Sequence, residues 1–229
     1  MKSTIKVIGF DADDTLWVNE PNYQEAETEL CRMLQPWLEE SEISRELFMT
    51  EMQNIEIYGF GAKGFLLSMI ETAIRVTNHS VTSEDISRII GIGKSLLDKP
   101  VILLDGIETV LQKLQSAYRL ILATKGDLLD QERKLEKSGL AKYFHHIEIM
   151  SDKQETNYLK LLERLDIRPD EFLMVGNSVK SDILPVLAIG AKAIHIPFEV
   201  TWQHEKMHPS SINEAYITVG ELSDILEFL

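Results

Sequence analysis

The most informative part of the sequence for the fold is Ile5-Lys6-Val7-Ile8-Gly9-Phe10-Asp11-Ala12-Asp13-Asp14-Thr15. Apolar side chains dominate residues 5–10, and an acidic cluster follows at once. A short apolar run with such a polar boundary is typical of a strand that is buried on both faces of a parallel sheet. Ligands of open α/β sheets bind at the carboxyl ends of the strands. The stretch therefore predicts an α/β core whose chemistry begins at Asp11.

The bulk composition limits the partners that the chain can have. Its 229 residues are 44% hydrophobic and 26% charged, which is enough for one core, or for one core and a smaller domain. The formal net charge of -14 repels nucleic acid and anionic membrane surfaces, so we expect no nucleic acid and no membrane as partner. Cys31 is the only cysteine, and no signal peptide or membrane-spanning run is evident. These features predict a cytoplasmic protein.

Two different hydrophobic patterns divide the chain. Residues 18–97 have apolar side chains at helical spacing and predict an inserted helical domain. The other segments, 1–17 and 98–229, alternate short apolar runs with helical patterns and predict a doubly wound parallel sheet. The strands that we expect after the first are residues 119–124, 146–150, 171–175 and 192–196, and the helices between them are residues 128–138, 157–165 and 181–189.

Polar residues follow each predicted strand, where the carboxyl edge of the sheet would bring them together. They supply carboxylates, a hydroxyl group, ammonium groups and a glycine. Four segments in chain order carry them: Asp11-Ala12-Asp13-Asp14-Thr15, Thr124-Lys125-Gly126, Ser151-Asp152-Lys153, and Gly176-Asn177-Ser178 with Asp182 shortly beyond.

These four segments, in this order, resemble the four sequence motifs of the haloacid dehalogenase superfamily. Asp11-Ala12-Asp13-Asp14-Thr15 matches its first motif, Asp-x-Asp-x-Thr, and the resemblance covers essentially the whole chain. It implies a Rossmann-like core. It also implies that residues 18–97 are the mobile helical cap of the branch with a C1 cap. The implied activity is Mg²⁺-dependent hydrolysis of a small phosphate monoester through a phosphoaspartate intermediate.

The resemblance also implies a role for each motif residue. Asp11 would be the nucleophile, and Asp13 the general acid and base. Four residues would bind the phosphoryl group, and these are Thr124, Lys125, Gly126 and Lys153. The oxygen ligands of Mg²⁺ would come from Asp11, the backbone carbonyl of Asp13, and Asp182, with Asn177 as an uncertain fourth.

Two features of the motifs bear on the reaction. Relatives that cleave carbon–halogen bonds lack the second aspartate of the first motif, so Asp13 favours phosphate chemistry. Many relatives have an acidic residue where this chain has Asn177, which leaves that ligand in question. A phosphomutase of the same superfamily, or a catalytically silent binding protein with the same fold, stays an alternative.

Substrate selection would lie in the helical insert. The segment Gly59–Gly64 fits G-x-G-x-x-G, but no strand precedes it, so we interpret it as a turn between two helices. There Tyr58, Phe60 or Lys63 are candidates for selecting the substrate. Nucleotides, sugar phosphates and other small phosphorylated metabolites stay open, as does the oligomeric state.

The sequence contains one further metal-like motif. His204-Glu205-Lys206-Met207-His208 fits H-E-x-x-H, which binds zinc when it lies on a helix. Pro209 follows directly, so we interpret this segment as a polar loop and not as a zinc site.

Overall fold

A computed structural model describes residues 4–207 and 216–229 of the chain. By their internal contacts these residues form two compact units. The first comprises the residues up to Glu20, Val101–Lys125 and the residues from Arg133 onwards. The second comprises Pro21–Pro100 and Gly126–Glu132.

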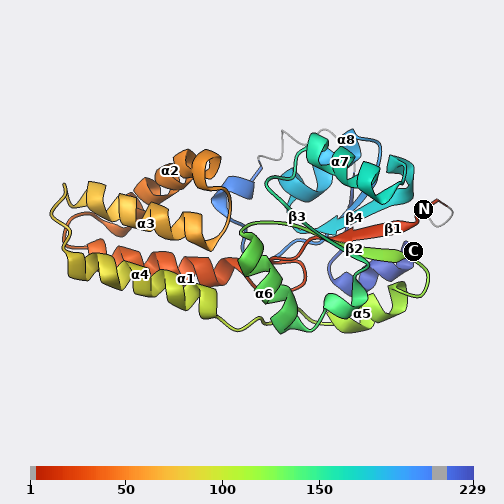
Figure 1. The fold of residues 1–229 in the computed structure, drawn as a ribbon, viewed down its shortest axis with the longest axis horizontal. Helices are drawn as coiled ribbons and strands as arrows, with labels where there is room; N and C mark the ends of the chain where they lie inside the picture. The colour runs from red at the N-terminus through yellow and green to blue at the C-terminus, as the bar shows by residue number, and fades with distance from the viewer. Residues whose placement is uncertain (1–3, 208–215) are drawn as a thin grey trace. The chain divides into compact units, whose positions relative to one another are not determined.

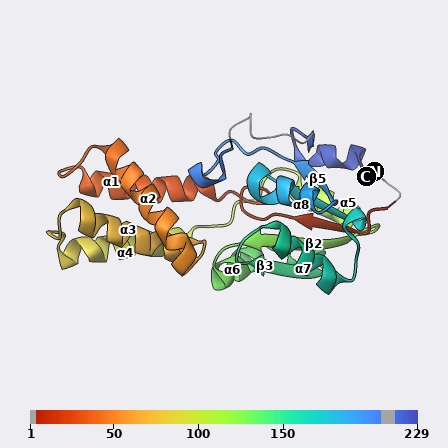
Figure 2. The ribbon, with the colours of Figure 1, turned by 90° about the horizontal axis from the view of Figure 1, so that it is seen from above.

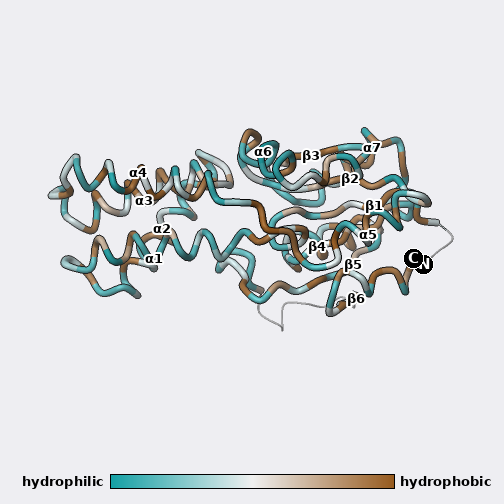
Figure 3. The backbone as a smooth tube through the Cα atoms, turned by 90° about the horizontal axis from the view of Figure 1, so that it is seen from below, coloured by the Kyte–Doolittle hydropathy of each residue, from teal (hydrophilic) through white to brown (hydrophobic). Residues whose placement is uncertain are grey.

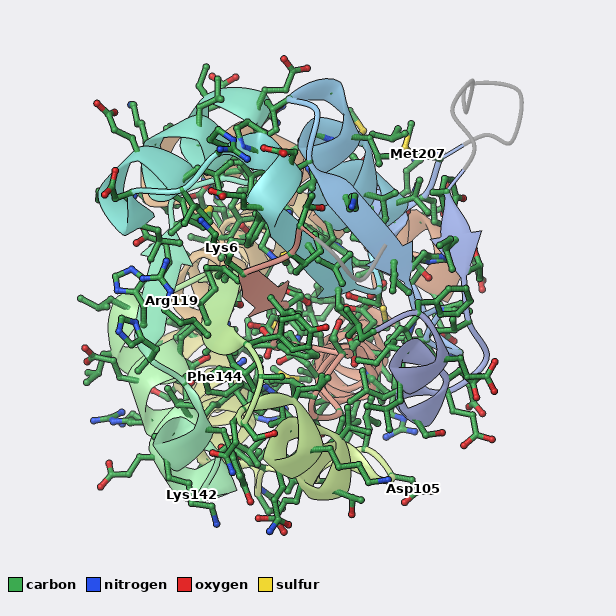
Figure 4. The ribbon with its side chains drawn as sticks, turned by 90° about the vertical axis from the view of Figure 1, so that its right-hand side faces the viewer. Lys6, Asp105, Arg119, Lys142, Phe144 and Met207 are labelled. Carbon is green, nitrogen blue, oxygen red and sulfur yellow. The ribbon has the colours of Figure 1, made fainter. Side chains whose placement is uncertain are left out.

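The first unit is built on a parallel sheet with the order β3-β2-β1-β4-β5-β6. Its strands are β1 (Val7–Phe10), β2 (Arg119–Lys125), β3 (His146–Met150), β4 (Phe172–Gly176), β5 (Lys192–His195) and β6 (Ile217–Thr218). The first strand, β1, pairs with β2 on one side and β4 on the other, so the acidic cluster that follows it lies at the middle of the carboxyl edge. Lys6 and Arg119 mark the opposite, amino ends of β1 and β2 (Figure 4).

Helices cover both faces of this sheet, as the doubly wound prediction requires. Figure 1 shows α7 (Glu155–Leu165) and α8 (Leu184–Ala188) above the strands and α5 (Ile107–Leu114) below them. Successive residues of a strand point to opposite faces. Accordingly Val7 packs into the core with α7 and α8, whereas Ile8 packs into the core with α5. Both are fully buried, which fits the apolar run of the sequence.

The second unit contains four amphipathic helices, which Figure 2 shows as a group. They are α1 (Glu20–Leu34), α2 (Glu40–Tyr58), α3 (Ala62–Val76) and α4 (Ser83–Asp98). The tube in Figure 3 alternates between hydrophilic and hydrophobic colour along them, and the apolar stripes meet in a core that includes Leu30, Leu47, Met69 and Ile89. Within the described part of the chain, no helix is long and apolar enough to cross a membrane.

The remaining helical segments are short. They are α6 (Leu128–Ser138), the 3₁₀ turns Ala141–Tyr143, Pro169–Glu171, Gln203–Glu205 and Leu222–Glu227, and the π-helix η3 (Val179–Ile183). Helix α6 has the predicted bounds. The helices α5 and Leu222–Glu227 and the strand β6 were not predicted.

The predicted helix over residues 181–189 was wrong in its first turn. The structure has the π-helix η3 there, followed by the short helix α8. Pro185 has no N–H to donate to the carbonyl of Ser181, four residues earlier, so a regular α-helical bond is impossible at this point. The hydroxyl of Tyr158 donates to that carbonyl instead, at 3.0 Å.

Gly9 leaves no room for a side chain in β1, and this gives a test of the packing. A Cβ atom at this position would lie 2.7 Å from Cζ of Phe172 and 3.1 Å from Sδ of Met174. We expect Gly9→Ala to lower the free energy of unfolding by about 1–3 kcal/mol, because overpacking forces buried side chains to move. Urea unfolding measures this difference.

The matched control is Gly91→Ala, on the exposed surface of α4, where a Cβ atom would have no neighbour within 4 Å. There alanine should be neutral or stabilise by up to about 1 kcal/mol, because it favours the helix. Equal stabilities of Gly9→Ala and the parent protein would contradict the packing described for β1.

Candidate functional site

Three segments of the first unit meet at a buried ammonium group. Nζ of Lys153 donates to Oδ1 of Asp11 and, at 2.6 Å, to Oδ1 of Asp182. These side chains follow β1, β3 and β4, and Lys153 and Asp11 are 142 residues apart in the chain. Asp11 is 7%, Lys153 2% and Asp182 1% exposed, so all three charges are held away from bulk water.

The backbone after β1 and β4 explains how the two carboxylates come together. The N–H of Asp11 donates to the carbonyl of Val175 at 2.9 Å and continues the ladder beyond β1. Asp182 lies in η3 and accepts from the N–H of Ser178 at 3.0 Å. A Cβ atom on Gly176 would lie 2.3 Å from Oδ2 of Asp182. Only glycine therefore permits this approach of the carboxylate to the end of β4.

Burial and neighbouring charges shift the pKa values of the group. Burial raises the pKa of Asp11, the charge of Lys153 lowers it, and the charge of Asp182 raises it, with a result of about 7. Burial alone would lower the pKa of Lys153, but Asp11 and Asp182 outweigh that effect and raise it. Lys153 therefore stays a cation at neutral pH and stabilises the ionised form of the carboxylates.

Asp13 is held by two donors on the same oxygen. Nε1 of Trp17 and Nζ of Lys134 each donate to Oδ1 of Asp13 at 2.7 Å. Lys134 lies on α6 and also donates to Oδ1 of Asn19 at 3.1 Å. These bonds fix the orientation of the second carboxylate of the first motif.

Thr15 connects the ends of β1 and β4. Its hydroxyl group donates to Oδ2 of Asp11 or to Oδ1 of Asn177, each at 3.2 Å, and accepts from the N–H of Asn177 at 3.1 Å. Asp14 instead accepts from the N–H groups of Asn19 and Glu20 and thereby shapes the turn before α1. The hydroxyl group of Thr15 therefore lies between Asp11 and Asn177 and contacts both.

Three of the residues predicted to bind a phosphoryl group lie at the end of β2, and their surroundings differ. Thr124 is buried and is the second-last residue of the strand. Nζ of Lys125 donates to Oγ of Ser181 at 3.0 Å and pairs with the carboxylate of Glu205. Gly126 comes next in the chain and has a φ of 134°, a backbone conformation that residues other than glycine rarely adopt.

Glu205 joins Lys125, Ser178 and Ser181 in a polar cluster, and the sequence analysis did not predict this role for it. Besides Lys125, it accepts from Oγ of Ser178 and, at 2.7 Å, from Oγ of Ser181. Its neighbour His204 contacts Nζ of Lys180 through Nε2 at 3.1 Å. Both residues belong to the motif that resembled a zinc site, and their side chains have these other partners. The motif's second histidine, His208, lies outside the described residues.

The three candidates for substrate selection lie at the turn between α2 and α3 of the second unit. Tyr58 is exposed and its hydroxyl group donates to Oε1 of Glu71 at 3.3 Å. Phe60 is partly buried, and exposed Lys63 pairs with Oδ2 of Asp127 at 2.9 Å. The G-x-G-x-x-G segment is a turn that leads into α3, as expected.

The donor set of the site fits Mg²⁺. Among the described residues, no three His, Cys, Asp or Glu side chains gather so that they could hold a metal ion by themselves. Mg²⁺ is commonly held by only one or two carboxylates, together with water and substrate phosphate. Asp11 and Asp182 supply two buried carboxylates against the single ammonium of Lys153, and a cation would balance the excess negative charge.

Comparison with known families gives one match over most of the chain. The model of the haloacid dehalogenase-like hydrolases matches residues 5–190. This range contains all of the site residues described above except Glu205 and His204.

Individual relatives agree with this match. A curated relative is the N-acylneuraminate-9-phosphatase of Mus musculus, which is 25% identical over 202 residues and covers 83% of this chain and 82% of its own. A solved structure of a haloacid dehalogenase-like hydrolase from Xanthomonas campestris is 38% identical, with a TM-score of 0.82 and coverage of 91% and 88%.

A second similar structure is that of the hydrolase YfnB of Bacillus subtilis, described as bound to magnesium. It is 16% identical, with a TM-score of 0.67 and coverage of 99% of both chains, and it supports the fold.

The buried Glu205 cluster gives a pH-dependent prediction. Burial alone would raise the pKa of Glu205, but the charge of Lys125 and the hydrogen bonds from Lys125, Ser178 and Ser181 lower it to about 2. The folded state therefore binds fewer protons than the unfolded state between about pH 4.5 and pH 2. The stability that Glu205 contributes is fully present above this window and is lost as the pH falls through it.

We expect Glu205→Gln to lower the free energy of unfolding at pH 7 by about 1–3 kcal/mol. The difference from the parent should shrink as the pH falls from about 4.5 to about 2. Urea unfolding at several pH values measures it. The control is Glu199→Gln, an exposed glutamate of the same segment, which should leave stability unchanged. A pH-independent difference would show that Glu205 is not ionised in the cluster.

Proposed function

The chain belongs to the haloacid dehalogenase-like hydrolase family, and we propose that it hydrolyses a small phosphate monoester with Asp11 as nucleophile and Mg²⁺ as cofactor. The observation that carries the proposal is the buried group at the carboxyl edge of the sheet. The ammonium of Lys153 donates to both Asp11 and a second carboxylate, Asp182. Asp13 lies two residues after Asp11 in the chain. A phosphatase among the curated relatives supports the choice of phosphate chemistry.

The proposed reaction has two steps. An oxygen of Asp11 attacks phosphorus, the bond from phosphorus to the leaving oxygen breaks, and Asp13 gives its proton to that oxygen. In the second step Asp13 takes a proton from water as the water oxygen attacks phosphorus. The bond from phosphorus to Asp11 then breaks and inorganic phosphate leaves.

Positively charged and hydrogen-bonding groups hold both aspartates in place. The ammonium of Lys153 holds Asp11 and offsets the negative charge of the phosphoryl group, which is the main requirement of phosphoryl transfer. Trp17 and Lys134 hold Asp13 by one oxygen, so the carboxylate is fixed before substrate arrives. Thr124, Lys125 and Gly126 would receive the phosphoryl oxygens at the end of β2.

Mg²⁺ would be held by the carboxylates of Asp11 and Asp182 and by the backbone carbonyl of Asp13, with Asn177 as a further candidate. When bound, it would offset the repulsion between Asp11 and the substrate phosphate. The magnesium-bound YfnB of Bacillus subtilis supports this choice of metal.

We further propose that α1 to α4 act as a cap that selects a small phosphorylated metabolite, with Tyr58, Phe60 and Lys63 as candidate contacts. The activity named for the mouse relative makes N-acylneuraminate 9-phosphate one member of the panel to test, beside nucleotides and sugar phosphates. The single buried cysteine, Cys31, is compatible with a cytoplasmic location.

The central test is phosphate release from this panel with and without Mg²⁺. We expect Asp11→Asn to lower kcat by about a thousandfold or more, because the amide cannot attack phosphorus. Malachite-green detection of inorganic phosphate measures the rate. The control is Asp105→Asn, which makes the same chemical change at an exposed loop (Figure 4) and should not alter the rate.

Product analysis on the same panel separates the alternatives. A phosphomutase would yield an isomeric phosphoester without net phosphate, and a silent binding protein would yield no product. If Asp11→Asn released phosphate as fast as the native protein, Asp11 would not be the nucleophile.

The cap proposal makes a separate prediction. Lys63→Ala should raise KM for the preferred substrate by about tenfold, the effect of one lost hydrogen bond to a charged group, and should leave kcat for p-nitrophenyl phosphate unchanged. Steady-state kinetics on both substrates measure this. Lys94→Ala removes an exposed lysine of α4 and is the control. If KM and the ranking of the substrates in the panel stayed unchanged, Lys63 would not be a residue that selects the substrate.

A further inference from the structure

Glu205 is a largely buried carboxylate that the proposed reaction does not use. Its side chain is 11% exposed, in the turn Gln203–Glu205 between β5 and β6. A buried carboxylate is costly unless it is paired and hydrogen-bonded, so its position requires an explanation.

The partners of Glu205 come from two separate parts of the sheet edge. Oε1 pairs with the ammonium of Lys125 at the end of β2. Oε2 accepts from the hydroxyl groups of Ser178 and Ser181, which lie after β4. Lys125 also donates to Oγ of Ser181, so one carboxylate and one hydroxyl group connect the two segments.

Each partner is next to a residue of the proposed active site. Lys125 follows Thr124, the candidate for phosphoryl binding, and Ser178 follows Asn177. Ser181 precedes Asp182, the candidate metal ligand, and its N–H donates to Oγ of Ser178 at 3.0 Å. Any movement of the two segments relative to each other would break bonds to Glu205.

The segment that carries Glu205 has a second attachment to the same turn. Nζ of Lys180 donates to the carbonyl of His204 at 2.9 Å, and the ring of His204 lies against that of Trp202. The segment that carries Glu205 is therefore itself attached to the turn after β4.

We propose that Glu205 is a positioning residue that holds the phosphate-binding end of β2 and the metal-binding turn after β4 in one fixed arrangement. It touches neither substrate nor metal and acts through Lys125, Ser178 and Ser181. The inference rests on the proposed function, because it assigns these two segments to phosphate and Mg²⁺.

The test measures ligand binding as well as turnover. Isothermal titration gives the affinities of Glu205→Gln for Mg²⁺ and for inorganic phosphate in the presence of Mg²⁺. Phosphate release gives kcat and KM. We expect both affinities to fall about tenfold or more, as is usual when a group that orients metal ligands is removed, and the Mg²⁺ concentration for half-maximal turnover to rise equally. Circular dichroism checks that the variant is folded.

Two further variants separate positioning from general damage. Glu199→Gln makes the same change of charge at an exposed site of the same segment and should leave both affinities within about twofold. In a double-mutant cycle with Lys125→Met, the effect of Glu205→Gln should become smaller, because part of it acts through Lys125 and the rest through Ser178 and Ser181. If Glu205→Gln fails to fold, Ser181→Ala removes one donor without altering charge and should weaken Mg²⁺ binding several-fold.

The outcomes are distinct. Unchanged affinities in folded Glu205→Gln, or effects that simply add to those of Lys125→Met, would overturn the positioning role. Native protein that binds both ions but releases no phosphate would contradict the proposed function alone, and the titrations would still decide the role of Glu205. Native protein that binds neither ion would overturn both.

Discussion

The arrangement of the site depends on one buried cation. The ammonium of Lys153 lies between Asp11 and Asp182, and each of the three charges needs the others because none is exposed to water by more than 7%. Removal of one partner would leave an unpaired buried charge, which is strongly destabilising. This requirement brings the ends of β1, β3 and β4 together, and it places a candidate nucleophile beside a permanent positive charge.

The fold meets this requirement with close backbone contacts and irregular local structure. Gly9 allows β1 to lie against Phe172, and Gly176 allows Asp182 to approach the end of β4. The turn that carries Asp182 is a π-helix in which the N–H of Leu184 donates to the carbonyl of Val179, and Pro185 has no N–H to continue it as an α-helix. π-Helical turns are frequent at functional sites. The irregular segment is thus the one that presents a carboxylate to Lys153.

Much of this site could be predicted from the sequence, because strand ends of a parallel sheet share one edge. That rule places the segments of Asp11, Lys153 and Asp182 at one edge, and the resemblance to the haloacid dehalogenase superfamily singles out these three residues within them. The partners of these residues were harder to foresee. Trp17 lies only four residues after its partner Asp13. Lys134 and Glu205, in contrast, are 121 and 80 residues away from their partners Asp13 and Lys125. Such pairs depend on the packing of α6 and of the segment after β5, which no periodicity encodes.

The central claim is that Asp11 carries the phosphoryl group during turnover. Acid quenching of the native protein in the presence of substrate and Mg²⁺, followed by peptide mass spectrometry, tests it most directly. The peptide containing Asp11 should gain the mass of one phosphoryl group, hydroxylamine should remove this group, and Asp11→Asn should never acquire it. Phosphate release without this adduct, or with the adduct on another residue, would contradict the account.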